Sequence, residues 1–253
     1  MIRKIFTTIF SIVIVLGMSS FKGVESNTKK DPINPPSEVF NDYSLDLYNK
    51  LNDSDLSYEA FKTALKGYLK LHVEDQVANN DYLTIIDMSQ SANEDRFYLI
   101  DLKNQEIITK SKVAHGRNSG NEYAKNFSNK IGSYQSSLGF FKTAETYHGK
   151  HGLSLRLDGL EHSNFNARKR AIVIHSADYV SENFISQTGR LGRSLGCPAL
   201  PEEDFSKIIK LIKEGSILFI YYPEENYFER SNLAASININ QLFTQNSSVS
   251  EAK

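Results

Sequence analysis

A histidine that follows an apolar run and a cysteine in a glycine–proline turn are the residues best suited to chemistry in this sequence. His175 follows residues 171–174, which have the composition of a buried strand, and Cys197 lies between Gly196 and Pro198. Side chains at strand ends leave the core, and reactive groups often lie there. Glycine lets a backbone approach a substrate closely, and proline fixes the direction in which the chain leaves. This pattern predicts a nucleophilic thiol with a histidine as its base.

The chemistry expected of this pair is nucleophilic attack by a thiolate on a carbonyl carbon. A free thiol has a pKa of about 8.5 and is only partly ionised at neutral pH. An imidazole within hydrogen-bond reach takes the proton, and the resulting thiolate attacks a carbonyl carbon. A third group must orient the imidazole: a carboxylate, an amide or a backbone carbonyl, for which Ser194 is one candidate. The backbone N–H groups around Gly196 and Cys197 suit a developing oxyanion.

The start of the chain has the pattern of an export signal. Arg3 and Lys4 precede an apolar run over residues 5–16, which small residues follow. This run is shorter than the about 20 apolar residues that span a bilayer. We expect a signal peptide over residues 1–20 and a location in the periplasm or cell envelope. Only an uncleaved signal would leave the protein tethered to the membrane.

If the protein is exported, the number of its cysteines is informative. The chain of 253 residues has a single cysteine, whereas exported proteins use cysteine mainly in disulfide pairs. Cys197 is therefore a free thiol, an intermolecular link or a working residue, although a lone buried cysteine also serves as a small hydrophobic group. The formal net charge of -1 gives no reason to expect a nucleic-acid partner, which requires a concentrated basic surface.

The elements that position the pair follow a polar linker over residues 21–36. Apolar spacing predicts an α-helical extension over residues 37–80, and short β-branched and aromatic runs then predict a mainly β catalytic domain over residues 81–223. The tail over residues 224–253 is polar, and we expect much of it beyond residue 226 to be loosely ordered. The first three strands should form an antiparallel meander. The expected strands are residues 82–87, 96–102, 106–114, 139–146, 153–157, 171–175 and 216–222, with an amphipathic helix over 205–213.

Several other side chains are candidates for binding a substrate. A guanidinium grips a carboxylate through two hydrogen bonds, which makes Arg193 a candidate, the alternative being a solvated loop charge or an internal salt bridge. Arg190 is a weaker candidate for the same role. His115 ends its own strand and would line the cleft. Tyr179 follows the catalytic histidine by four residues and would cover the site or simply pack.

The remaining histidines raise the question of a metal site. His148, His151, His162 and His175 with the cysteine would make an acceptable zinc ligand set. However, the first two lie in a glycine-rich loop rather than on a helix face, so their spacing carries little weight. We expect no metal or cofactor, since thiol chemistry needs none, and we expect His151 to contact substrate or to belong to a flexible loop.

The segment over residues 192–199 resembles the murein L,D-transpeptidase catalytic domain family, in its branch with Gly-Arg-Ser-x-Gly-Cys-Pro-Ala. The resemblance implies a β-rich fold in which Cys197 is the acyl nucleophile, His175 is its base and peptidoglycan stem peptides are the substrate. The thiolate would attack the carbonyl of the L-centre of the third residue, expel the terminal D-alanine and pass the acyl group to an amine of a neighbouring stem. The resemblance covers roughly residues 55–222 and includes, in order, residues 114–116, 127–129, 136–139, 147–152, 154–157, 159–161, Arg170 and 175–179.

One position departs from the family pattern. The best-known L,D-transpeptidases have Ser/Thr-His-Gly-Cys, whereas Leu195 stands here in place of the histidine. Any role of that histidine in binding substrate or choosing the acceptor therefore does not carry over. Two alternatives stay open: an L,D-carboxypeptidase-type hydrolase that uses water as the acceptor, and a non-catalytic peptidoglycan-binding envelope protein that kept the fold.

Overall fold

The computed structural model describes residues 36–235 of the chain. The expected signal peptide over residues 1–20, nearly all of the expected linker and the tail beyond residue 235 lie outside the described residues. Within residues 36–235, no helix has the length and apolar character needed to cross a bilayer.

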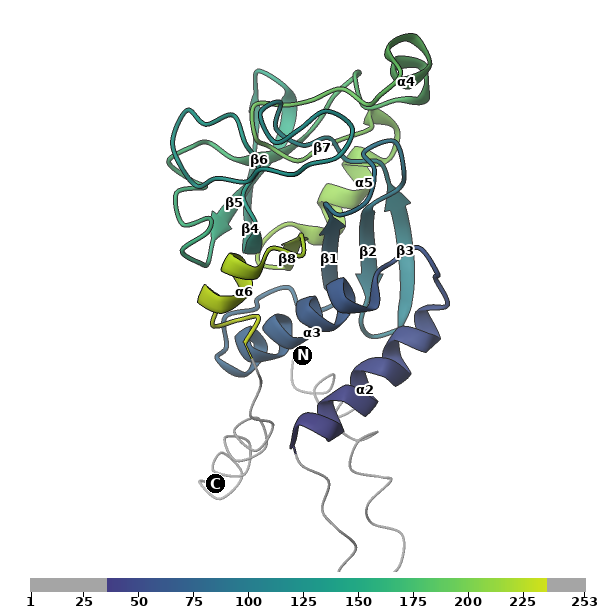
Figure 1. Cartoon of the computed structure of the whole chain (residues 1–253), viewed down its shortest axis with the longest axis vertical. Coiled ribbons are helices and arrows are strands. Elements are labelled where there is room, and N and C mark those ends of the chain that lie inside the picture. The colour runs from purple at the N-terminus through teal and green to yellow at the C-terminus, as the bar shows by residue number, and fades with distance from the viewer. Residues whose placement is uncertain (1–35, 236–253) are drawn as a thin grey trace, which may run out of the picture. The chain divides into compact units, whose positions relative to one another are not determined.

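One eight-stranded sheet carries the functional residues (Figure 1). Its strand order is β3-β2-β1-β8-β4-β5-β6-β7. The first three strands form the expected antiparallel meander, and β8 then lies parallel to β1 and antiparallel to β4, so that it joins the meander to the rest of the sheet. The strands are β1 Tyr82–Asp87, β2 Phe97–Asp101, β3 Glu106–Ser111, β4 Gly139–Gly149, β5 Gly152–Gly159, β6 Val173–Ser176, β7 Ala199–Leu200 and β8 Ile217–Tyr221.

The mainly β fold with N-terminal helices is the predicted one, and the differences lie at strand ends. The strand expected over residues 171–175 begins two residues later, because Ala171 adopts a φ of 53° that an extended strand cannot hold. The strands expected over residues 139–146 and 153–157 extend into a hairpin in which Gly149 pairs with Gly152. Two short elements were not predicted: β7, which has two residues, and the helix α4 Glu182–Thr188.

The two N-terminal helices pack on the sheet. They are α2 Pro36–Leu51 and α3 Tyr58–Val73, and α3 begins at an N-cap, Ser57, whose hydroxyl accepts the N–H of Ala60. Their buried apolar residues belong to the same core as the strands. The closest approach is at Gly67, where an added Cβ would lie 2.1 Å from the ring of Phe140 in β4. The expected division at residue 81 therefore does not separate two cores.

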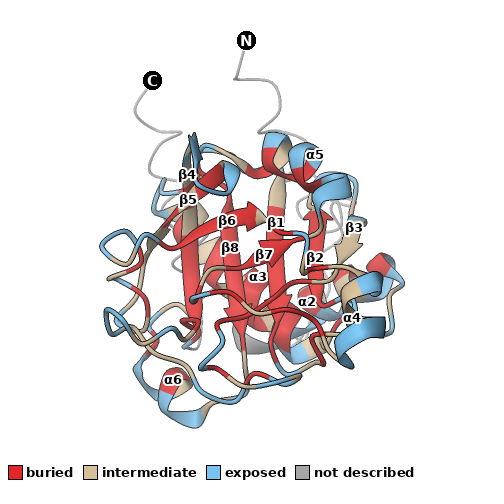
Figure 2. Ribbon diagram, turned by 90° about the horizontal axis from the view of Figure 1, so that it is seen from above, coloured by how far each residue is buried: buried red, intermediate tan, exposed pale blue. Residues whose placement is uncertain are grey.

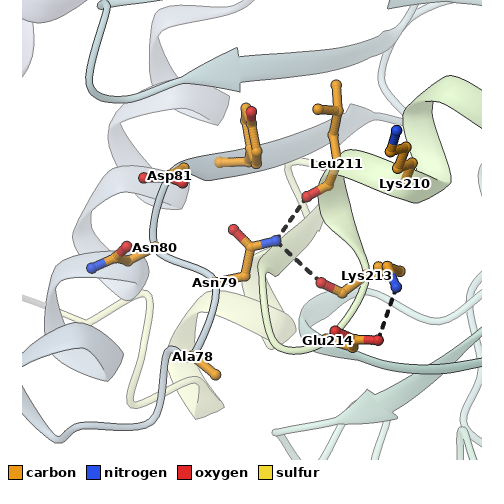
Figure 3. Close-up of a pocket in the computed structure, with 9 residues that line it drawn as sticks. Ala78, Asn79, Asn80, Asp81, Lys210, Leu211, Lys213 and Glu214 are labelled. Atoms are coloured by element: carbon orange, nitrogen blue, oxygen red, sulfur yellow. Dashed lines mark hydrogen bonds and ion pairs between the residues drawn. The ribbon is translucent and has the colours of Figure 1, made fainter. Parts of the chain in front are cut away.

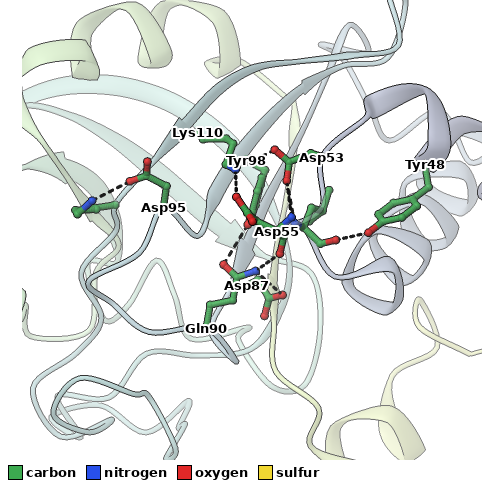
Figure 4. A network of polar contacts seen from close by, with 10 residues as sticks. Tyr48, Asp53, Asp55, Asp87, Gln90, Asp95, Tyr98 and Lys110 are labelled. Carbon is green, nitrogen blue, oxygen red and sulfur yellow. Dashed lines mark hydrogen bonds and ion pairs between the residues drawn. The ribbon is translucent and has the colours of Figure 1, made fainter.

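A polar network attaches the loop between these helices to the sheet (Figure 4). Lys110 of β3 forms ion pairs with Asp53 at 2.9 Å and Asp55 at 2.5 Å. Gln90 donates to the Asp55 carbonyl at 2.6 Å, and the Tyr48 hydroxyl donates to the carbonyl of residue 56 at 2.6 Å. The loop is held by both charge and backbone contacts.

The first part of the polar tail is ordered, whereas its residues beyond 235 lie outside the described residues. Residues after β8 form the helix α6 Glu225–Arg230, and the Tyr227 hydroxyl donates to the carboxylate of Glu161 at 2.9 Å. Ser231 also donates to that carboxylate, which accepts the N–H of Phe140 at 2.8 Å. Polar composition alone predicted disorder, whereas these long-range contacts hold the segment against the domain. The amphipathic helix expected over residues 205–213 is α5 Glu202–Ile212.

Candidate active site

Parallel pairing of β6 with β7 places the turn that carries Cys197 beside the strand that carries His175. In this register His175 is opposite Ala199, and the His175 N–H donates to the carbonyl of Pro198 at 3.4 Å. Both strands are buried, and they lie next to each other in the view of Figure 2. The structure thus brings the two predicted catalytic residues into neighbouring segments. The thiol itself lies 3.7 Å from the carbonyl of Ala171, and hydrogen bonds of catalytic groups often tighten only when substrate binds.

The imidazole of His175 is oriented by the carbonyl of the next residue. Its Nδ1 lies 2.9 Å from the Ser176 carbonyl, so Nδ1 carries the proton and Nε2 holds the free lone pair. The Ser194 carbonyl, one candidate for this role, instead accepts the N–H of Arg117 at 2.8 Å. The physical reason is the bridge between Ser194 and Gly116, which turns that carbonyl towards the neighbouring segment. A backbone carbonyl has no signal in the sequence, so Ser176 was not predicted.

His151 stacks on His175 from the turn between β4 and β5. The two ring centroids are 4.4 Å apart with an interplanar angle of 24°, and His151 is exposed while His175 is 3% exposed. Burial lowers the pKa of His175, the Ser176 carbonyl opposes this shift, and the nearby His151 lowers the pKa further. Burial, with a smaller contribution from His151, therefore favours the neutral imidazole, and the stacked ring covers one side of it.

The turn before the nucleophile depends on a serine and a glycine. Gly196 has a φ of 126°, and an added Cβ would lie 2.9 Å from the carbonyl oxygen of Gln135. The Ser194 hydroxyl accepts the Gly196 N–H at 3.0 Å and donates to the Cys197 carbonyl at 2.6 Å. Since the Gly196 N–H is already used, it is a poor donor to an oxyanion, contrary to the prediction. The Cys197 N–H makes no hydrogen bond within residues 36–235 and is the better donor.

The electrostatics of the thiol and imidazole favour their neutral forms at rest. Burial raises the pKa of Cys197, while the N–H of Val173 and the charge of Arg170 lower it. Because the thiol pKa is raised and the His175 pKa is lowered, a preformed thiolate–imidazolium pair is disfavoured. The geometry therefore fits proton transfer to His175 as the thiol attacks.

Arg170 supplies a positive charge beside the thiol. Its Nη1 donates to the Ser128 carbonyl at 2.7 Å and the Ser137 hydroxyl at 2.5 Å, and its Nη2 donates to the Ser133 hydroxyl at 3.2 Å and the Gln135 carbonyl at 2.5 Å. All four partners are neutral, so no carboxylate among them offsets the charge. The guanidinium therefore braces the surrounding loop, and its charge also favours the thiolate.

Arg170→Gln is expected to raise the pKa of Cys197, because an opposite charge near an acid favours the ionised form. The measurement is the pH dependence of alkylation by iodoacetamide, followed by intact mass. Arg170→Lys keeps the charge but loses part of the bracing, so it should retain the alkylation profile while lowering the melting temperature. An unchanged profile in Arg170→Gln would show that the guanidinium acts only as a brace.

His115 does not line the cleft, contrary to the prediction. Its ring is fully buried, with Nδ1 2.8 Å from a guanidinium nitrogen of Arg96 and Nε2 3.4 Å from the Gly120 carbonyl. Arginine only donates, so Nδ1 accepts and the ring is neutral. Burial and the charge of Arg96 lower the pKa of His115 to about 3. The strand end meets the loop over residues 116–138 instead of solvent, which makes this histidine structural.

This burial predicts a loss of stability in acid. Between the ordinary value of 6.5 and about 3, the unfolded state binds a proton at His115 and the folded state does not. The free energy of unfolding should therefore fall by roughly 2 kcal/mol from pH 7 to pH 5 through this residue. Urea titrations at both pH values check the slope, which should flatten in His115→Gln but persist in His162→Gln, an exposed control. Equal slopes in all three proteins would contradict the prediction.

Arg193 and Tyr179 lie next to the site, and both side chains also make contacts within the protein. One nitrogen of Arg193 donates to the carbonyls of Arg117 at 3.1 Å and Gly120 at 2.8 Å and to the amide oxygen of Asn121 at 2.9 Å. The ring of Tyr179 packs where a Cβ on residue 192 would stand. Burial and the nearby Cys197 raise the Tyr179 pKa to about 12. The Tyr179 ring packs against residue 192 and is influenced by Cys197, so its surroundings include features of both alternatives, packing and covering the site.

A separate surface pocket lies away from Cys197 (Figure 3). It has a volume of about 480 Å³ and lies between residues 78–82 and residues 210–214. Asn79 points to the end of α5 and donates to the carbonyls of Leu211 at 2.7 Å and Lys213 at 3.1 Å. None of the residues that line this pocket comes from the segments that carry His175 and Cys197. Among the residues described, no three histidine, cysteine or acidic side chains are grouped to hold a metal ion.

The sequence model of a family described as the L,D-transpeptidase catalytic domain matches residues 52–221. Among solved structures, an L,D-transpeptidase from Mycobacterium smegmatis is 12% identical with a TM-score of 0.36, over 56% of this chain and 59% of that one. An L,D-transpeptidase from Mycobacterium tuberculosis H37Rv is 11% identical with a TM-score of 0.37, over 56% of this chain and 58% of that one. Both matches span less than two thirds of the solved chains, and no curated protein matches.

Proposed function

The chain belongs to the L,D-transpeptidase catalytic domain family, and from this premise we propose that it is an exported cysteine acyltransferase that acts on peptidoglycan stem peptides. The observation that supports the proposal best is the parallel pairing of His175 with Ala199, which sets the Cys197 turn beside an oriented base. The fixed turn, the lone pair on Nε2 of the imidazole and the available N–H of Cys197 supply the other parts that acyl transfer needs.

In the acylation step the proton of the Cys197 thiol passes to Nε2 of His175 while sulfur attacks the carbonyl carbon of the stem's third residue. The Cys197 N–H donates to the developing oxyanion. Collapse of the tetrahedral intermediate breaks the amide bond, and the imidazolium gives its proton to the departing amine of D-alanine. A thioester on Cys197 remains.

In the second step an amine of a neighbouring stem attacks the thioester carbonyl. His175 takes the amine proton and returns it to the leaving sulfur, which restores the thiol and completes a 3→3 crosslink. Water in place of the amine would release a tripeptide stem and make the protein an L,D-carboxypeptidase. Leu195, in the turn before Cys197, is 58% exposed and stands where the best-known L,D-transpeptidases carry histidine. The difference between transfer and hydrolysis lies in how the site admits an amine and excludes water.

The test is intact-mass spectrometry of the purified chain after incubation with a muropeptide that carries a tetrapeptide stem. We expect a mass increase equal to the donor minus D-alanine, mapped to Cys197 by peptide digestion. A β-lactam of the carbapenem class should also acylate this thiol. Crosslinked dimers among the released products would show transfer, and tripeptide stems alone would show hydrolysis. Binding of the muropeptide without any adduct would overturn the proposal in favour of a non-catalytic envelope protein.

Export is part of the same proposal. It is supported by the basic start and short apolar run of residues 1–20. The expected result is a mature protein in the envelope fraction whose mass lacks this segment. A full-length protein in the membrane fraction would instead indicate an uncleaved anchor.

A further inference from the structure

Three arginines surround a surface pocket beside the nucleophile. The pocket has a volume of about 310 Å³ and is formed by Arg117, Arg190, Arg193, Tyr179, Phe184 and Gly192. We call these six residues the arginine pocket. A volume near 300 Å³ suits a small ligand group rather than a whole polymer. Two aromatic rings and three guanidinium groups give the pocket both an apolar wall and positive charge.

The three positive charges have no negative partner in the part of the chain that the structure describes. Within residues 36–235, no carboxylate lies within 4.0 Å of the nitrogens of Arg117, Arg190 or Arg193. By contrast, Arg168 forms ion pairs with Glu145 and Asp158. Burial lowers the pKa of Arg193, and the charges of Arg190 and Arg117 lower it further. Like charges held together without a counter-ion repel one another, and an anionic ligand relieves that repulsion.

The contacts of the three arginines within the protein do not occupy all of their N–H donors. Arg117 lies over the ring of Tyr134 at 4.3 Å, and it is exposed. Arg190 donates through one nitrogen to the carbonyl of Leu191 at 2.8 Å. Arg193 uses one nitrogen for its loop contacts. Each guanidinium has five N–H donors, so each keeps donors for a ligand.

The arginine pocket is lined by residues close in the chain to both His175 and Cys197. Tyr179 forms part of its wall, and the pKa of this tyrosine is raised first by burial and then by Cys197. Gly192 and Arg193 begin the loop that leads directly to the nucleophile. A donor held with its scissile carbonyl at Cys197 therefore has neighbouring groups within reach of the pocket.

We propose that the arginine pocket binds free carboxylates of the acyl-donor stem and so selects donors whose side carboxylates are not amidated. The inference rests on the proposed function for the identity of the donor. Planar guanidinium groups bind a carboxylate through paired N–H donors, whereas an amide has one acceptor oxygen and no charge. Tyr179 and Phe184 would pack against the aliphatic part of the donor's third residue.

The test compares a free-acid tetrapeptide stem with the same stem amidated on its side carboxylates. Calorimetric titration of the Cys197→Ala protein measures binding without turnover. We expect the free acid to bind at least roughly tenfold more tightly, and the difference to shrink as ionic strength rises from about 0.01 M to about 1 M. The double variant Arg117→Gln/Arg190→Gln, made in the Cys197→Ala protein, should lose this preference. Arg193 is kept because it braces the loop.

The matched control is Arg230→Gln in the same background, which removes one exposed positive charge on α6, outside the pocket. It should bind both stems as the parent does. Equal binding of the two stems by the parent, or an intact preference in the double variant, would overturn the inference. Thioester formation on the intact thiol is measured separately. Selective binding of the free-acid stem with no thioester would contradict only the proposed function. Thioester formation with no preference for the free-acid stem would contradict only the role of the arginine pocket.

Discussion

Replacing Cys197 by alanine is expected to lower the release of D-alanine by roughly 10⁴-fold or more, because no other thiol exists in the chain to form the thioester. The fold should survive the change. The side chain is only partly buried, and its sulfur makes one weak contact, 3.7 Å from the Ala171 carbonyl. The free energy of unfolding should therefore change by less than about 1 kcal/mol. Turnover is followed by mass spectrometry of released products, and stability by urea titration.

Cys197→Ser is the matched control for this prediction. It keeps the size and hydrogen-bonding capacity of the side chain, but a hydroxyl ionises far less readily than a thiol. We expect residual turnover no greater than about one hundredth of the parent rate. Full activity in either variant would place the nucleophile elsewhere and contradict the role of Cys197.

Replacing His175 by glutamine is expected to slow acylation by roughly 10²- to 10⁴-fold, the usual contribution of a general base. Glutamine preserves a polar side chain of similar reach but cannot accept the thiol proton. The measurement is single-turnover thioester formation as a function of pH. In the parent protein, activity is lost as pH falls through the His175 pKa, because a protonated imidazole cannot act as base. Since burial and His151 lower this pKa, the acid limb should lie below pH 6.5 and disappear in His175→Gln.

His151→Gln provides the matched comparison, because it removes the stacked ring but leaves the base. His151 lowers the pKa of His175, so its loss should move the acid limb towards higher pH with a smaller fall in rate. An acid limb that stays in place in both variants would mean that another group controls acylation.

Much of the fold could be predicted from local pattern. Alternating and apolar runs located the strand over residues 82–87 at its observed bounds, and helical spacing located both N-terminal helices. These patterns are visible in the sequence because burial repeats along each element with its own period. The two-residue strand β7 escaped notice, since a run that short has no period. The helix α6 escaped notice because polar composition does not reveal a partner such as Glu161, distant in the chain.

The candidate site likewise has features that local sequence pattern predicts and features that only long-range contacts decide. The sequence by itself determined which side chains are predicted to carry the chemistry, because a lone cysteine in a glycine–proline turn and a histidine at the end of an apolar run are recognisable as residue types. Only the tertiary structure decided that the Ser176 carbonyl orients the base, that His115 is buried against Arg96, and that three arginines share one pocket. Each of these depends on backbone direction or on pairing between distant segments. Neither quantity is encoded in the spacing of residues along the chain.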